Sequence, residues 1–87
     1  MNNNITKYCL MCAENCLDYV VGDYVAFYDI YYGDGFPYFL PGKTSNIETA
    51  FKTNSVTEIT QFLKKHLPAW INFFKICEIN TTIKVLL

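Results

Sequence analysis

The chain has 87 residues, of which 52% are hydrophobic, and a formal net charge of −1, so we expect one domain with a modest core. All seven of its basic residues are lysines, and without a guanidinium fork for phosphates or base edges we expect no direct binding of nucleic acid. Its longest apolar, charge-free stretch is far shorter than the roughly 20 residues of a transmembrane helix, which argues against a membrane partner.

The first half of the chain predicts strands. Residues 5–12 alternate as a strand does, and a turn at 13–15 leads into a second run over 16–21. After a turn at Gly22 and Asp23, residues 24–32 are rich in aromatic and β-branched types, so the three runs predict an antiparallel meander. Pro37 restricts the next run, 36–40, to a short edge strand.

The second half predicts one helix and further strand. Ser55 and Glu58 fit a capping box, which indicates a helix over about 55–66 that Pro68 ends. Residues 71–79 are predicted to form a strand, and 81–87 another strand or a tail. We therefore expect an α+β domain over residues 1–87, with 1–4 disordered, in which a small antiparallel sheet of three to five strands has one helix packed on one face.

Cysteine and histidine give the candidates for a chemical site. Cys9 and Cys12 have the spacing of a zinc knuckle, and Cys16 follows, but a second such pair is missing. If 5–12 is a strand, Cys9 and Cys12 point to opposite faces, so we expect these cysteines, and Cys77 far downstream, to be buried, reduced thiols. A metal or redox role of Cys9, Cys12 and Cys16 is the alternative. The single histidine, His66, lies where an imidazolium favours the end of a helix. We expect no enzyme activity and no cofactor.

Charge segregation is the most informative feature of the sequence. Between Tyr8 and Gly42 the chain has five acids and no lysine, whereas residues 43–87 have six lysines and three acids. Acids interleaved with tyrosines predict a face that attracts a basic partner, and the alternative is a solvated face that keeps the sheet soluble. The predicted partner-binding residues are Asp18, Asp23, Tyr24, Asp29, Tyr31 and Asp34.

In size, charge pattern and coarse topology over its whole length, the chain resembles the small accessory proteins of phages and mobile elements, among them anti-CRISPR proteins. The resemblance includes no shared motif, and it transfers no residue role. It implies an inhibitor that blocks a basic nucleic-acid-binding groove on a bacterial nuclease effector such as a Cas protein. Because the sequence shows neither a signal peptide nor a transmembrane stretch, we expect a cytoplasmic location, which is the host cytoplasm if a phage encodes the protein. The alternatives are a structural homodimer that buries Tyr24, Tyr28 and Tyr32, and a small metal or redox protein.

Overall fold

The computed structural model describes the backbone of residues 2–33 and 36–84, and the side chains of residues 4–26 and 42–82. Within these residues one antiparallel sheet of four strands, in the order β3-β2-β1-β4, is accompanied by one α-helix and two 3-10 helices. The predicted α+β class is confirmed, with a small antiparallel sheet and a helix close to 55–66. The elements are β1 (Asn2–Cys12), β2 (Tyr24–Gly33), β3 (Phe36–Thr44), η1 (Ile47–Thr49), α1 (Val56–His66), η2 (Pro68–Phe73) and β4 (Phe74–Lys84).

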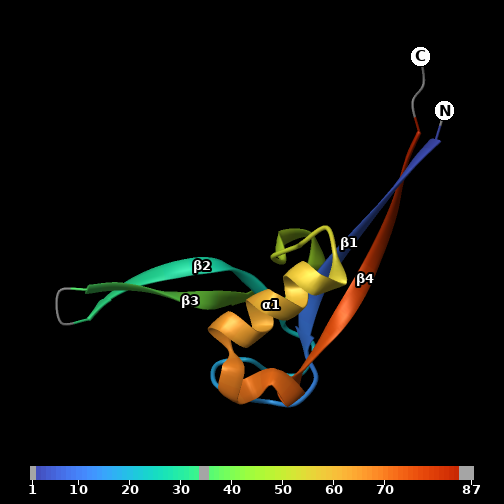
Figure 1. Cartoon of the computed structure of the whole chain (residues 1–87). Coiled ribbons are helices and arrows are strands. Elements are labelled where there is room, and N and C mark those ends of the chain that lie inside the picture. Colours follow the sequence, from blue (N-terminus) through green and yellow to red (C-terminus); the bar gives the residue numbers. More distant parts are fainter. Residues whose placement is uncertain (1, 34–35, 85–87) are drawn as a thin grey trace.

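The sheet opens into two ribbons that point away from each other (Figure 1). β1 pairs with β4 along its whole length, from Asn2 opposite Lys84 to Cys12 opposite Phe74, so residues predicted to be disordered at the start of the chain belong to a strand. β2 pairs with β3 in the other ribbon, and in the described sheet β1 is in register with β2 only near Met11. The molecule is accordingly elongated, with extents of 54 × 29 × 23 Å.

A short extended segment, residues 50–53, lies between β1 and β2 at the point where the two ribbons separate. The amide and carbonyl of Tyr8 in β1 bond to those of Thr53 at 3.0 and 2.9 Å. The amide of Phe51 donates to the carbonyl of Val25 in β2 at 2.9 Å. The segment therefore satisfies backbone groups that β1 and β2 cannot offer to each other after they separate.

The hydrophobic core lies at the junction of the ribbons, under α1. Ile59, Phe62 and Leu63 recur at helical spacing and are buried against Leu10 of β1 and the residues around it. The side chain of Ser55 accepts a hydrogen bond from the amide of Glu58 at 3.1 Å, which confirms the serine half of the predicted capping box. The other members of the cluster are Cys12, Cys16, Tyr19, Val25, Leu67 and Phe74.

Two predicted strand segments have a different structure. Residues 16–21 form a loop, because the side chain of Asn15 accepts from the amide of Val21 and that of Asp23 accepts from the amide of Val20. These local bonds replace a strand partner. Residues 71–73 belong to η2, which has Pro68 in its first turn, a position that suits the fixed φ of proline.

Candidate functional site

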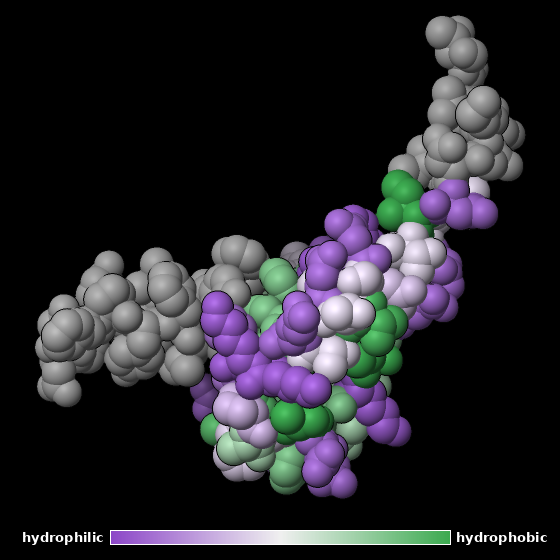
Figure 2. Space-filling view, in the orientation of Figure 1, coloured by the Kyte–Doolittle hydropathy of each residue, from purple (hydrophilic) through white to green (hydrophobic). Residues whose placement is uncertain are grey.

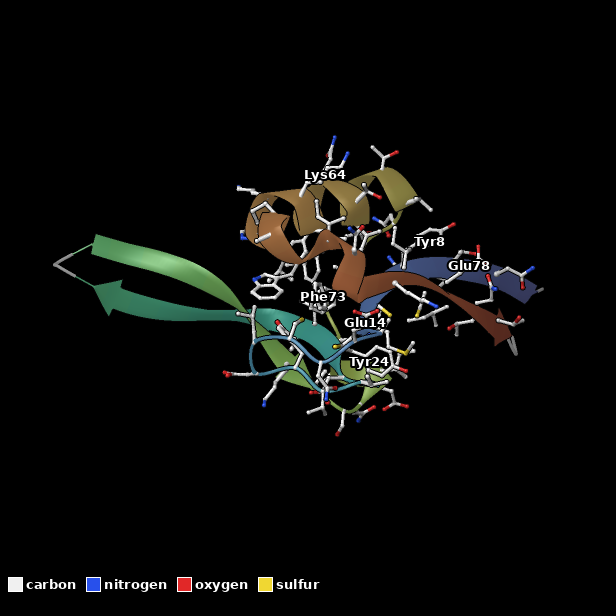
Figure 3. All side chains as sticks on the ribbon, turned by 90° about the horizontal axis from the view of Figure 1, so that it is seen from below. Tyr8, Glu14, Tyr24, Lys64, Phe73 and Glu78 are labelled. Carbon is white, nitrogen blue, oxygen red and sulfur yellow. The ribbon has the colours of Figure 1, made fainter. Side chains whose placement is uncertain are left out.

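The connection between β1 and β2, residues 13–23, is held firmly on the rest of the molecule; we call it the 13–23 loop. The amides of Ala13 and Glu14 both donate to the carbonyl of Phe73, at 2.8 and 3.3 Å, and Figure 3 shows Glu14 beside Phe73. At the other end the amide of Gly22 donates to the carbonyl of Cys12 at 3.0 Å. The loop is therefore tied to η2 and to the end of β1.

Two buried side chains anchor the middle of this loop. Cys16 and Tyr19 bond to each other through their backbones, at 3.2 and 2.8 Å, and both enter the core. The hydroxyl of Tyr19 donates to the carbonyl of Gly42 at 2.9 Å, and its ring meets Phe74 edge to face at 5.1 Å. Burial, more than the nearby Cys16, raises the pKa of Tyr19, so its hydroxyl stays a donor at neutral pH.

Three large aliphatic side chains of the loop face solvent. Leu17 is 60% exposed, Val20 56% and Val21 61%. Single exposed apolar residues are ordinary on protein surfaces, but three within five residues of an anchored loop form a patch. The lower end of the molecule in Figure 2, where this loop and η2 lie, shows hydrophobic and hydrophilic residues side by side.

Leu17 has a backbone conformation that leucine seldom adopts. Its φ is 50°, in the left-handed region, and it occupies the first central position of the turn between Cys16 and Tyr19. Glycine or asparagine suits such a position, because a Cβ atom there meets the backbone. The loop therefore holds an exposed leucine at a position where another residue would cost less.

The loop is also acidic. Glu14 and Asp18 are exposed, and Asp23 is half-buried with its carboxylate accepting from the amide of Val20 at 3.0 Å. Lys43 in β3 donates to the backbone carbonyl of Asp18 at 2.7 Å. Residues 13–23 contain three acids and no lysine, so the loop itself has a formal charge of −3, and Lys43 is one lysine beside it.

The predicted partner-binding residues are spread along the structure. Asp18, Asp23 and Tyr24 lie together at the junction, where Tyr24 is half-buried. Asp29 and Tyr31 are in β2, where their backbones pair with Leu40 and Tyr38 of β3, but their side chains are outside the described residues, and so is all of Asp34. At about 3.3 Å per residue, β2 runs roughly 30 Å away from Tyr24, so the structure does not gather all these positions into one patch at the junction.

Sequence reasoning missed the exposed aliphatic residues of the 13–23 loop. A strand over 16–21 would have placed Leu17 and Val21 on one face and Val20 on the other. The signal for a loop was present in Asn15 and Asp23, whose side chains accept from backbone amides six and three positions away.

The cysteines are free thiols that divide into two pairs. Cys12 and Cys16 are buried in the core, and the Cys12 thiol donates to the carbonyl of Glu14 at 2.9 Å. Cys9 is buried on the opposite face of β1, where its register partner is Cys77 of β4. The expectation that Cys9 and Cys12 point to opposite faces agrees with this arrangement. Across the described residues no group of three or more His, Cys, Asp or Glu side chains is placed to hold a metal ion.

His66 differs from the imidazolium expected at the end of α1. Its ring lies 4.7 Å from that of Phe62, and burial, followed by the charge of Lys65, lowers its pKa. The neutral ring is therefore favoured. His66 is part of the lining of a shallow groove of about 320 Å³ beside α1, to which Phe51 and Thr53 also contribute.

No family model, curated protein or solved structure matches this chain. Among the described residues no helix has both the length and the apolar character needed to cross a membrane.

Proposed function

We propose that this protein is a non-enzymatic protein-binding module, with the 13–23 loop as its contact surface for a basic partner. The observation that supports this most is the exposure of Leu17, Val20 and Val21 on a loop whose backbone and buried anchors hold it in place. Because the loop is already ordered, binding costs little conformational entropy. Such a rigid apolar centre with a polar border is typical of protein interfaces.

The patch of Leu17, Val20 and Val21 is too small to be the whole interface. Full burial of a Val or Leu side chain contributes about 1.5–3 kcal/mol, so covering three side chains that are a little over half exposed contributes roughly 3–5 kcal/mol in total. A stable interface covers about 800 Å² on each partner. The contact therefore extends beyond the loop, and η2 and the base of the β2–β3 ribbon are its neighbours at the junction.

The negative charge of the loop favours a basic partner. Glu14 and Asp18 are exposed beside the apolar patch, and they attract lysine- or arginine-rich surfaces and speed up association with them. In a narrower form of this proposal, the protein is an anti-CRISPR-like inhibitor that blocks the basic nucleic-acid-binding groove of a bacterial nuclease effector. The acidic first half of the sequence and its resemblance to phage accessory proteins support this form.

Affinity capture from an extract of the natural host, with identification by mass spectrometry, tests the general proposal. Val20→Ser combined with Val21→Ser, and separately Asp18→Lys, should lower capture of the main partner at least tenfold. Val56→Ser and Glu48→Lys are matched controls, because Val56 is 49% exposed on α1 and Glu48 is exposed on η1. If the loop variants and the controls capture the same amount of partner, the loop is not the contact surface.

Plasmid cleavage by a panel of purified Cas nucleases tests the narrower form. One equivalent of the protein should stop cleavage by a susceptible nuclease, and the Asp18→Lys variant should restore it. If every nuclease of the panel still cleaves fully and the loop-dependent partner is another protein, the nuclease-inhibitor function is refuted. The function as a protein-binding module then still holds.

A homodimer is the second candidate, because β4 is an edge strand of the described sheet and leaves one side of its backbone open. Glu78 lies opposite Tyr8, whose own amide and carbonyl face Thr53, so the amide of Glu78 points to the open side. Glu78→Pro would therefore block pairing between copies without breaking the β1–β4 ladder. A dimer that this substitution dissociates, measured by light scattering, supports the homodimer, and a monomer at all concentrations refutes it.

A further inference from the structure

Cys9 and Cys77 face each other across the β1–β4 ribbon. They are register partners, so their side chains lie on the same face of the ribbon. The amide and carbonyl of Tyr8 bond to Thr53 on the far side of β1, and those of Cys9 therefore point towards β4. In such a hydrogen-bonded pair the Cα atoms are about 5.5 Å apart, within the 4.4–6.8 Å range of disulfides.

The two thiols differ in accessibility. Cys9 is 0% exposed, whereas Cys77 is half-buried and reachable from solvent. Burial and the neighbouring Cys77 raise the pKa of Cys9 to about 11, against a smaller opposing effect of Lys52. Because the thiolate is the nucleophile in disulfide exchange, Cys77 reacts first and Cys9 second.

We propose that Cys9 and Cys77 form a reversible disulfide by exchange with a small-molecule disulfide such as oxidised glutathione. In the first step the Cys77 thiolate attacks one glutathione sulfur, the S–S bond breaks, and one reduced glutathione leaves with a proton from solvent. In the second step Cys9 loses its proton and attacks the Cys77 sulfur of the mixed disulfide, which releases the second reduced glutathione. Two thiols of the protein are oxidised and one glutathione disulfide is reduced.

The geometry makes this bridge a labile one. Opposite Cβ atoms in an antiparallel pair are about 4.5–5.5 Å apart, towards the longer end in hydrogen-bonded pairs, whereas a disulfide needs about 3.5–4.5 Å. The two Cβ atoms must approach each other by about 1 Å, and the resulting strain favours reduction. The bridge therefore responds to the redox state around the protein, and it does so whether or not the 13–23 loop binds a partner.

Cys12 and Cys16 provide a matched control pair. Both are buried in the core, and they are joined by a loop instead of being paired across two strands. The Cys12 thiol already donates a hydrogen bond to the carbonyl of Glu14. Replacing both with alanine removes their thiols and keeps the main-chain groups through which β1 and β4 pair.

The test incubates the native protein with oxidised glutathione and maps its peptides by mass spectrometry. The wild type should yield a peptide pair joined through Cys9 and Cys77, with the loss of two hydrogens, and Cys12→Ala with Cys16→Ala should yield the same link. Cys9→Ser should instead stop at the mixed disulfide on Cys77, and excess reduced glutathione should open the wild-type bridge.

Three results would overturn the proposal. These are a native wild-type protein with no linked peptide, a link between Cys12 and Cys16 in its place, or a bridge that withstands excess reduced glutathione. The first comparison requires no variant, so a substitution that prevents folding leaves the test intact.

Discussion

The conformation of Leu17 leads to a prediction on stability. It distinguishes a leucine that is exposed on the surface from a leucine that packs into the fold. Leu17→Gly removes the Cβ atom at a φ of 50° and relieves about 1–2 kcal/mol of left-handed strain. Against this gain, glycine costs about 0.5–1 kcal/mol in unfolded-state entropy. The lost side chain was 60% exposed, so the burial that it gives up contributes only about 1 kcal/mol.

These contributions nearly cancel, and we expect Leu17→Gly to change the free energy of unfolding by less than about 1 kcal/mol. Leu17→Val is the matched control, because a β-branched residue is a genuine outlier at positive φ. The valine variant should be at least about 1 kcal/mol less stable than the glycine variant.

Urea unfolding followed by the fluorescence of the single tryptophan, Trp70, measures both variants. With a total stability of about 4–13 kcal/mol for a domain of this length, differences of this size are resolved. A loss of more than about 2 kcal/mol in Leu17→Gly would contradict this expectation, because it would mean that Leu17 is packed into the fold. The glycine variant, still folded, should also capture less partner than the wild type.

Leu10→Ala should destabilise the protein by about 2–5 kcal/mol in the same urea assay, since Leu10 is fully buried. Its register partner Ile76 is 40% exposed, and Ile76→Ala should cost clearly less; equal losses would contradict the position of the core. Ser55→Ala should cost about 1 kcal/mol and Ser55→Gly only a few tenths, because glycine is itself an acceptable N-cap. The lowered pKa of His66 means that the folded state binds its proton less well than the unfolded state, so stability should fall as the pH drops below about 6.5. His66→Gln should remove that part of the pH dependence, measured as the difference between the two stability profiles, and identical profiles would contradict it.

Local signals in the sequence were sufficient for the helix and for one edge of the sheet. Ser55 and the apolar spacing from Ile59 to Leu63 define α1 without help from the rest of the chain. Pro37 restricts the run 36–40 to an edge strand, and β3 is an edge strand. These features depend on neighbouring residues, which a sequence displays directly.

The pairing of strands from opposite ends of the chain could not be predicted from the sequence. β4 begins at Phe74 and extends to Lys84 because β1 offers a partner along its whole length, which also orders residues from Asn2 onwards. The register that brings Cys9 opposite Cys77 depends on this pairing between the two ends of the chain. Residues 50–53, which pair with β1 and β2 where the two ribbons separate, are likewise distant from both strands in the sequence.

The sequence predicted acidic residues of the candidate site but did not predict the conformation of the loop that carries them. Asp18 and Asp23 lie on the 13–23 loop, yet the residues next to them were expected to be strand. The polar side chains of Asn15 and Asp23 satisfied backbone amides locally, so Val20 and Val21 became part of an exposed loop. Hydrophobic alternation does not distinguish this arrangement from a half-buried strand.

Site-directed photo-crosslinking tests the role of the 13–23 loop most directly. A benzophenone amino acid replaces Val20 in one variant and Val56 in another, two exposed valines of which the first lies on the loop and the second on α1. We expect a covalent adduct with the captured partner from position 20 and none from position 56. Adducts from position 56 alone, or equal adducts from both, would contradict it.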